Sequence, residues 1–272
     1  MPELPEVETV RRVLSDNLIG LKITDIDVRY PKMIDNDLEY FYSNVINKEI
    51  VDIKRLGKYL IFILNDGAII SHLRMEGKYF YVNDDSIDNK HVHFIFRLSN
   101  GYSLMYQDVR KFGRIEYKKN DELYNTKPLS ILGVDPILNN KIEINDIYDR
   151  IINKTIPIKS TLLEQSIICG LGNIYVDEVL HKSGVLPSRL SNTITLDEVR
   201  LIIEASIEIL TKAIAFKGTT IRSYTSSLGI KGEYQQFLNI HTKNICAICS
   251  TNVSKMKIGG RTTYYCSKCQ RW

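Results

Sequence analysis

Four of the five cysteines lie near the end of the chain, in two Cys-x-x-Cys pairs. The pairs are Cys246-Ala-Ile-Cys249 and Cys266-Ser-Lys-Cys269, with sixteen residues between them. This spacing is typical of a four-thiolate zinc site, in which each pair occupies a tight turn and two strands connect the turns. Chance spacing or a redox-active pair is the alternative, but two pairs at this separation favour the metal. We therefore expect one structural Zn²⁺ that folds a small zinc ribbon.

The basic charge of the chain is concentrated in the same segment. Residues 241–272 contain six Lys or Arg and no Asp or Glu, whereas the rest of the chain has 30 basic and 32 acidic residues. A block of one sign is usually a solvated tail, but the cysteines favour a folded basic module that faces a polyanion. Gly259-Gly260-Arg261 lies between the pairs, where a hairpin tip would let Arg261 reach a phosphate. An exposed arginine without a ligand is the alternative.

The first half of the chain carries the pattern of an antiparallel β domain. A helix is predicted to begin within a few residues of the N-terminus, because Val7, Val10, Leu14 and Leu18 recur at helical spacing after Pro5. Over residues 22–117, short β-branched and aromatic runs alternate with hairpin signals such as Ser99-Asn100-Gly101. This pattern predicts an antiparallel β-sandwich.

The second half carries helical periodicity, predicted over residues 144–152, 158–169, 174–182 and 196–215. The fold class is therefore α+β, with an N-terminal helix and β-sandwich followed by a helical domain and the zinc ribbon. We expect a β domain with its N-terminal helix at residues 1–130, a helical domain at 131–237 and a zinc finger at 238–272.

Several broad classes of protein are disfavoured. No apolar run approaches the roughly 20 residues that a membrane helix needs, and no secretory signal pattern is present. Five cysteines are a poor disulfide framework, and Cys169, alone in an apolar stretch, is interpreted as a small core residue. We expect a cytoplasmic, monomeric protein without a membrane partner.

The start of the chain offers an unusual nucleophile. Initiator methionine is normally removed before proline, which would expose the secondary amine of Pro2. An α-amine has a pKa near ~8 against ~10.4 for lysine, so a sizeable minority is neutral at physiological pH. A secondary amine can form only a cationic iminium, which serves as an electron sink for elimination. A proline at position two is by itself common.

Motifs along the whole chain resemble one family. The first is Pro2-Glu-Leu-Pro-Glu-Val-Glu8 and the last is the four-cysteine segment. Between them come, in order, Leu56-Gly-Lys-Tyr59, His72-Leu-Arg-Met-Glu-Gly77, Asp108-Val-Arg-Lys-Phe-Gly113, Pro157-Ile-Lys159, Leu162-Leu-Glu-Gln165 and Gly170-Leu-Gly-Asn-Ile-Tyr175. In this order and combination the chain resembles the bacterial formamidopyrimidine-DNA glycosylases from end to end.

The resemblance implies that residues 1–130 form the catalytic domain and that the helical domain at 131–237 contains a helix-two-turn-helix. It also implies a set of catalytic residues. Pro2 would attack the anomeric carbon of a damaged nucleotide, and Glu3 would act as general acid and base, with Glu6 supporting the site. Lys58 would bind the phosphate beside the lesion and assist base removal, and Arg261 would hold a phosphate. Without the resemblance, the two acidic residues are well placed at a helix N-terminus, and Lys58 is a charged residue in a turn.

The resemblance also implies a set of DNA-binding residues. His72, Arg74, Lys159 and Asn173 would hold backbone phosphates. For Asn173 there is an independent reason, since Gly170-Leu-Gly172 before a helix leaves N–H groups that can face an anion; a capping Asn is the alternative. Space left by a flipped base would be filled by three side chains, namely Met75, Arg110 and Phe112. Taken alone, these three would be interpreted as two core residues and a surface charge.

Two segments depart from the family pattern. Residues 217–224 match the loop that covers the flipped base, but Lys217 stands where glycine is expected. Ile240-His-Thr-Lys243 replaces a more usual Tyr-Gly-Arg stretch, which puts one phosphate contact in doubt. The reaction itself does not depend on these positions.

The resemblance thus predicts a bifunctional glycosylase and AP lyase that acts on double-stranded DNA carrying oxidised purines, chiefly 8-oxoguanine opposite cytosine and formamidopyrimidines. An endonuclease VIII-type enzyme for oxidised pyrimidines shares the proline chemistry and zinc, but Leu4, Val7 and the Met-Arg-Phe triad favour the purine enzyme. A non-catalytic zinc-containing DNA-binding protein would leave the acidic residues beside the Met-Pro start unexplained. Abundant Ile, Lys and Asn suggest an AT-rich bacterial genome as the source, and the resemblance implies that the protein acts at the bacterial nucleoid.

Overall fold

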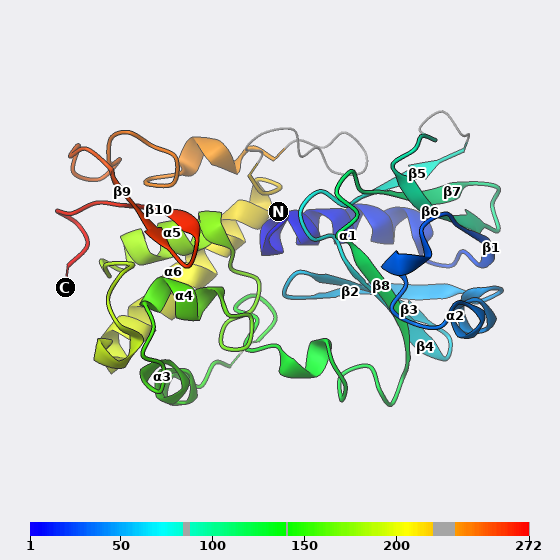
Figure 1. Ribbon diagram of the computed structural model, residues 1–272, viewed down its shortest axis with the longest axis horizontal. Helices are drawn as coiled ribbons and strands as arrows, with labels where there is room; N and C mark the ends of the chain where they lie inside the picture. Colours follow the sequence, from blue (N-terminus) through cyan, green and yellow to red (C-terminus); the bar gives the residue numbers. More distant parts are fainter. Residues whose placement is uncertain (84–87, 140, 220–231, 272) are drawn as a thin grey trace. The chain divides into compact units, whose positions relative to one another are not determined.

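The computed structural model describes residues 1–83, 88–139, 141–219 and 232–271 (Figure 1). Contacts between residues divide the chain into two compact units. The first contains residues 1–130 together with 217–219 and 232, and the second contains residues 131–216 and 233–271.

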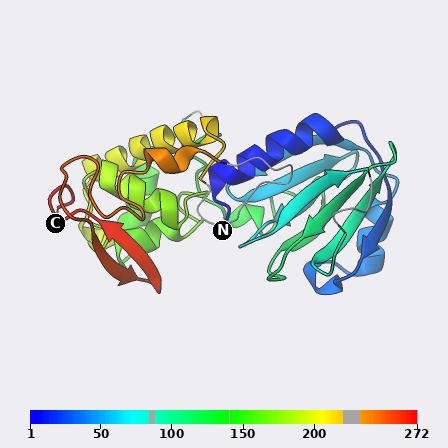
Figure 2. The same cartoon turned by 90° about the horizontal axis from the view of Figure 1, so that it is seen from above.

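Helix α1 (Leu4–Leu18) opens the first unit. Its apolar residues Val7, Val10 and Leu14 recur at helical spacing and are buried on one face. Pro5 lies in the first turn, where no intrahelical N–H donor is required, and the chain leaves the helix before Gly20, whose φ is +86°. Figures 1 and 2 show α1 running along strand β2, against which it packs.

Two four-stranded antiparallel sheets form the β part of this unit. One sheet has the order β1-β6-β7-β5, from Ile23–Val28, Val92–Leu98, Ser103–Gln107 and Lys78–Val82. The other has the order β2-β3-β4-β8, from Ile50–Leu56, Tyr59–Leu64, Gly67–His72 and Arg114–Lys119. A short helix α2 (Leu38–Val45) and a 3-10 turn at Pro31–Met33 lie between β1 and β2 in the chain.

One hydrophobic core joins these elements. It includes Val7 and Leu14 from α1, Phe62 from one sheet, and Phe94 and Phe96 from the other. Inward-facing residues from both sheets therefore meet in a single layer, as in a β-sandwich. The predicted N-terminal helix and sandwich are confirmed.

The second unit is mainly helical. It contains α3 (Ile144–Ile152), α4 (Ile158–Leu163), α5 (Asn173–Lys182) and α6 (Leu196–Ala215), followed by the hairpin of β9 (Ser254–Ile258) and β10 (Arg261–Tyr265). Short 3-10 turns lie at Leu129–Ile131, Ser191–Thr193 and Tyr234–Phe237. Helix α5 packs against α4, α6 and β10, and α3 packs against α6. Among the described residues, none of the helices combines the length and apolarity that crossing a bilayer requires.

One predicted helix is shorter than its periodicity suggests. Helicity was expected over residues 158–169, but α4 ends at Leu163. Beyond it the backbone pairs with a distant segment instead, because Val134 N–H donates to Ile167 O at 3.0 Å and Cys169 N–H donates to Val134 O at 2.9 Å. Apolar spacing alone does not distinguish this buried extended pairing from helix.

Candidate active site and nucleic-acid interface

The N-terminal residues of α1 are buried and tied to one another. Glu3 is the N-cap, and its backbone N–H donates to Glu6 Oε2 at 2.8 Å. Glu6 Oε1 accepts from the backbone N–H of Thr219 at 2.7 Å. Gly218 has φ +82°, and a Cβ there would lie 2.4 Å from Glu6 Oε1, so a side chain at this position would clash. The Glu6 carboxylate therefore joins Pro2-Glu3 to the start of the segment at 217–224, of which residues 220–224 lie outside the described part.

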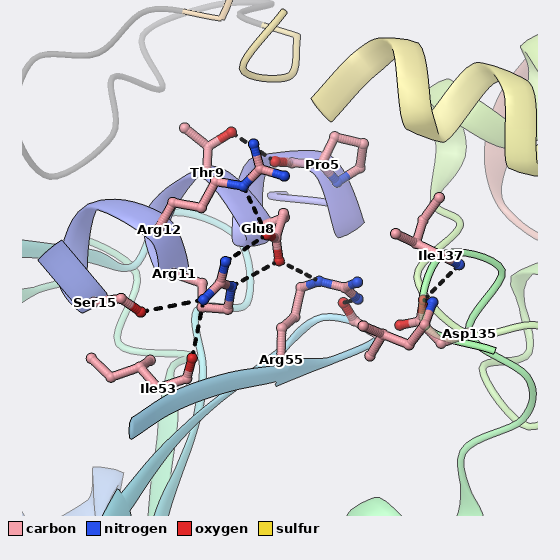
Figure 3. A network of polar contacts seen from close by, with 12 residues as sticks. Pro5, Glu8, Thr9, Arg11, Arg12, Ser15, Ile53, Arg55, Asp135 and Ile137 are labelled. Carbon is pink, nitrogen blue, oxygen red and sulfur yellow. Dashed lines mark hydrogen bonds and ion pairs between the residues drawn. The ribbon is translucent and has the colours of Figure 1, made fainter. Parts of the chain in front are cut away.

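Glu8 fixes the same helix to the sheet (Figure 3). Its carboxylate accepts from Arg11 at 2.9 and 3.0 Å, from Arg12 Nε at 2.9 Å and from Arg55 Nε of β2 at 3.1 Å. Arg11 also donates to Ile53 O at 3.2 Å. Burial by itself would raise the pKa of the Glu8 carboxyl, but the hydrogen bonds from Arg11 and Arg12 hold that pKa below its usual value. Glu8 is therefore ionised and holds α1 against β2.

Lys58 lies in a two-residue turn beside the start of α1. Gly57, with φ +56°, and Lys58 connect β2 to β3, since Leu56 pairs with Tyr59. Contacts between α1 and β2 run antiparallel, from Arg11 with Ile53 to Glu8 with Arg55. Continuing in this direction, the turn lies toward the N-terminal end of the helix, and Lys58 is buried there.

His72, the last residue of β4, is held as a neutral donor. Its Nδ1 accepts from the backbone N–H of Arg74 at 2.9 Å, and its ring meets Tyr59 edge-on at 4.6 Å. Burial, followed by the positive charges of Arg74 and Lys58, lowers the pKa of His72 to about 3. The ring is therefore uncharged at physiological pH, and its proton lies on Nε2. His72 can donate one hydrogen bond to an anion but adds no charge.

A concave surface next to His72 combines positive charge with exposed apolar side chains. Its cavity has a volume of about 430 Å³ and is lined by Met1, Arg74, Met75, Arg110, Phe112 and Arg114. Met75 is 38% exposed and Phe112 is 48% exposed. The Arg110 guanidinium carbon lies 4.7 Å from the centre of the Phe112 ring. Three arginines around two apolar tips suit contact with a phosphate backbone and insertion into a base stack.

In the second unit, Asn173 and Arg261 lie close together, whereas Lys159 faces the interior. Asn173 begins α5, and its Nδ2 donates to Thr262 O at 3.1 Å, next to Arg261 at the start of β10. Gly259 and Gly260 have φ +54° and +75° and form the tip of the β9–β10 hairpin, as predicted. Arg261 is exposed there, beside the N-terminus of α5.

The side chain of Lys159 has no exposed surface. Its Nζ donates to Asp177 Oδ1 at 2.7 Å, and Asp177 Oδ2 accepts from His241 Nδ1 at 2.8 Å and from the backbone N–H of Tyr264 at 3.2 Å. In this arrangement Lys159 cannot touch a DNA phosphate directly, so the geometry corrects that expectation. Lys159 instead joins α4 to α5 and, through Asp177, to the hairpin.

The four cysteines at the end of the chain form one cluster. The sulfur atoms of Cys246, Cys249, Cys266 and Cys269 all lie within 4.8 Å of one another. Two of the separations are 3.4 Å, from Cys249 to Cys266, and 3.9 Å, from Cys246 to Cys269. A tetrahedral zinc ion with Zn–S bonds of about 2.3 Å would separate its sulfur ligands by about 3.8 Å. The thiol positions therefore fit a four-coordinate metal ion.

Comparison with known proteins agrees with these features. A model of the formamidopyrimidine-DNA glycosylase N-terminal domain matches residues 1–115, and one of the formamidopyrimidine-DNA glycosylase H2TH domain matches residues 132–225. Formamidopyrimidine-DNA glycosylase of Streptococcus pneumoniae serotype 4 is 44% identical over 273 residues, which cover 100% of this chain and 99% of the relative. The Bacillus cereus strain ZK enzyme is 40% identical, with 99% of each chain covered.

The chain belongs to the formamidopyrimidine-DNA glycosylase family.

Solved structures of this family have the same fold. A mutant of the Lactococcus lactis protein in complex with DNA containing Fapy-dG has a TM-score of 0.93 and 38% identity, with 100% of both chains covered. The Lactococcus lactis protein in complex with DNA containing an abasic site has a TM-score of 0.92 and covers 99% of this chain. Family membership confirms the helix-two-turn-helix, which here consists of α4 and α5. Gln165 stabilises the connection between them by accepting from Gly170 N–H at 2.9 Å and donating to Leu171 O at 3.1 Å.

Several residues that support the family motifs were not singled out from the sequence. Glu8 and Asp108 lie within the family motifs, but the motifs do not show their partners. Glu8 accepts from Arg55, which is distant in the sequence, and Asp108 accepts from backbone N–H groups such as that of Phe112. Asp177 and Glu178 were not predicted at all; Glu178 accepts from the backbone N–H groups of three residues, Asn239, Ile240 and His241. Two adjacent acidic residues inside an apolar helix were the available signal, since buried carboxylates need partners.

The buried pair of Lys159 and Asp177 predicts a large effect on stability. Lys159→Met should lower the free energy of unfolding by about 3–5 kcal/mol, because it leaves a buried carboxylate without its cation. Lys154→Met is the matched control, since the pair of Lys154 and Glu164 is 39% and 36% exposed and should contribute about 1 kcal/mol or less. Urea unfolding followed by circular dichroism measures both. Equal losses in the two variants would contradict the role given to Lys159.

Proposed function

We propose that this protein is a bifunctional DNA glycosylase and AP lyase that excises oxidised purines, 8-oxoguanine opposite cytosine and formamidopyrimidines, from duplex DNA. The observation that carries the proposal is the N-terminus of α1, where Pro2 and Glu3 are buried and the preceding Met1 lines a basic concave surface. Relatives over the full length of the chain are named formamidopyrimidine-DNA glycosylases. The structures that match it hold DNA with Fapy-dG or an abasic site.

In the proposed reaction, the neutral amine of Pro2 attacks C1′ of the damaged nucleotide. A bond forms between the proline nitrogen and C1′ while the glycosidic bond breaks; the base leaves with the electron pair of that bond and gains one proton, and the proline nitrogen loses one. Glu3 then donates a proton to the sugar-ring oxygen as the ring opens and the iminium forms. The resulting cationic iminium draws electrons from the sugar. Loss of the C2′ proton then expels the 3′ phosphate and a second elimination expels the 5′ phosphate. Lys58 and Arg261 would hold phosphates beside the reacting sugar.

The remaining predicted residues are assigned to DNA binding. His72, Arg74 and Asn173 would contact backbone phosphates, with His72 as an uncharged donor. Met75 and Phe112 would enter the space of the flipped base, while Arg110 offers its donors to the orphaned cytosine. Lys159 would support Arg261 indirectly, through Asp177 and the hairpin of the second unit that carries Arg261.

The cysteine cluster is proposed to bind one structural Zn²⁺. When bound, the ion supplies folding energy to the ribbon and no reactive ligand position, since all four positions are occupied by thiolates. His181 supports the site, because its Nε2 lies 3.2 Å from Cys246 Sγ. We further propose three domains with boundaries at residues 130 and 237, a monomeric state, and action in the bacterial cytoplasm at the nucleoid, where the DNA substrate lies.

Borohydride trapping tests the proposed function. The protein is incubated with a duplex containing 8-oxoguanine opposite cytosine and, in parallel, with one containing an oxidised pyrimidine. A covalent adduct on Pro2 with the purine duplex, located by digestion and mass spectrometry, is the expected result. An adduct with only the pyrimidine duplex would indicate an endonuclease VIII-type enzyme instead. Binding without an adduct, in protein that lacks Met1, would indicate a non-catalytic DNA-binding protein.

A further inference from the structure

Asp108 is a buried carboxylate that organises the segment carrying Arg110 and Phe112. Its side chain lies at the end of β7 and is 0% exposed. Oδ1 accepts from the backbone N–H of Arg110 at 3.0 Å, and Oδ2 accepts from Phe112 at 2.9 Å and from Gly113 at 2.8 Å. Hydrogen bonds to a charged acceptor are roughly twice as strong as neutral ones. One carboxylate therefore sets the backbone of residues 110–113.

Asp108 is itself anchored to the sheet. Its backbone N–H donates to His91 O at 3.0 Å, and its carbonyl oxygen accepts from His93 Nε2 at 2.8 Å. The same carbonyl accepts from the N–H of Lys111 at 3.3 Å, which adopts φ +57°. A left-handed backbone is strained for lysine and persists only where its surroundings impose it. The segment is thus a preformed loop with Arg110 and Phe112 exposed at its tip.

The loop that carries Met75 shares a second anchor with it. A Cβ at Gly77 would lie 2.1 Å from Tyr106 Oη, and a Cβ at Gly113 would lie 1.8 Å from the same oxygen. The Tyr106 ring stacks on Phe94 with centres 4.7 Å apart, and both are buried in the core. The Tyr106 hydroxyl therefore packs against both glycines, Gly77 at the end of one loop and Gly113 at the end of the other. The two loops thus contact the same buried side chain.

We propose that Asp108 is a positioning residue that holds Arg110 and Phe112 as a rigid wedge, in register with Met75, before DNA binds. This inference rests on the proposed function and assigns a role that the sequence motifs did not identify. Extruding a base costs a few kcal/mol, and side chains on a mobile loop would lose part of their contact energy to ordering. Asp108 would act only through Arg110 and Phe112, and its effect is confined to the step in which a stacked base leaves the helix.

Asp108→Asn tests the role because it preserves shape but turns one acceptor oxygen into an NH₂ group that faces N–H donors. Excision of 8-oxoguanine opposite cytosine should fall about 10- to 100-fold, as expected for weakened bonds to a charged group. Borohydride trapping on a preformed abasic site, which has no stacked base to displace, should change by less than about threefold. The preference for cytosine over adenine opposite the lesion should narrow, since Arg110 is no longer held.

Asp37→Asn is the matched control. Asp37 caps α2 by accepting from Tyr40 N–H at 3.1 Å, and Asn is an equally good cap there. Both activities should be unchanged in this variant. If Asp108→Asn lowers excision and abasic-site trapping equally, its role is general stability and the proposal is wrong.

A double-mutant cycle separates positioning from other roles. In the background of Arg110→Ala with Phe112→Ala, Asp108→Asn should lower excision by less than about twofold further, because the groups through which it acts are gone. Additive losses would overturn the proposal.

Amide hydrogen exchange tests the role of Asp108 independently of activity. If wild-type protein fails to trap at all, the proposed function is wrong, and the role of Asp108 in the loop is then decided by this measurement. Exchange at residues 110, 112 and 113 should be at least about tenfold faster in Asp108→Asn, and unchanged exchange would overturn it.

Discussion

Blocking the nitrogen of Pro2 with one additional glycine before it is expected to lower excision of 8-oxoguanine by at least about 10³-fold, the scale of loss when a catalytic nucleophile is removed. An acylated nitrogen has no lone pair for attack, although α1 and the residues that bind DNA are retained. Adduct formation on borohydride treatment should be lost, while affinity for the lesion duplex should change by less than about tenfold. Single-turnover cleavage assays and fluorescence anisotropy measure the two quantities.

Two further variants make this test specific. Pro2→Ala keeps an α-amine but makes it primary, so a smaller loss is expected. Pro5→Ala changes a proline in the first turn of the same helix without touching the amine, and activity should stay within about threefold of wild type. If the extended protein remains active, the nucleophile lies elsewhere, with Lys58 as the first candidate. Intact mass of the purified protein establishes that Met1 is absent before either result is interpreted.

Replacing one cysteine of the proposed zinc site is expected to weaken lesion binding strongly without unfolding the first unit. Among the described residues, the core cluster of the ribbon combines its cysteines with Ile240, Val253 and Tyr264, which are few apolar groups to fold a segment of this size without metal. Cys266→Ala should therefore lose the bound zinc and lower affinity for the lesion duplex at least about 100-fold, because several phosphate contacts depend on the ordered hairpin. Native mass spectrometry and anisotropy measure these changes.

Cys169→Ala provides the matched cysteine control. Cys169 is buried in the second unit, outside the cluster of four thiols. Its replacement should leave zinc content unchanged and affinity within about threefold of wild type. Retention of zinc and full affinity by Cys266→Ala would show that the thiol cluster is not a required metal site.

Features set by local sequence were predicted well. Helices α3 and α6 begin and end at the expected residues, because their apolar periodicity and end signals, such as the Thr195 and Glu198 capping box, lie within the helices themselves. The hairpin tip at Gly259-Gly260 follows from the positive φ angles that a tight turn requires. The Cys-x-x-Cys spacing is likewise local, because two residues between the cysteines bring both sulfur atoms to one side of a tight turn.

The motifs that carry chemistry were also visible in the sequence, since residue types and their order are enough to match a family. Pro2, Glu3 and Lys58 were chosen in this way, and the structure adds a physical frame in which Glu6 and Glu8 hold that end of α1. The departure at His241 is explained by packing, because its Nδ1 bonds to the buried Asp177. Sequence spacing contains no information on such a contact across 64 residues.

The sequence by itself determined the residue types and their order: a proline at position 2 followed by acidic residues, two Cys-x-x-Cys pairs, and the succession of helices and strands. Only the tertiary structure decided which charged residues face solvent and which are buried. Lys159 was expected to contact a phosphate but is buried in an ion pair with Asp177. Asp108 was noted only as part of a motif, but its carboxylate accepts hydrogen bonds from the backbone of the following loop. The reason is physical. Helix periodicity, turns and Cys-x-x-Cys pairs depend on residues close together in the sequence, whereas the burial of a charge depends on partners that the complete fold brings together.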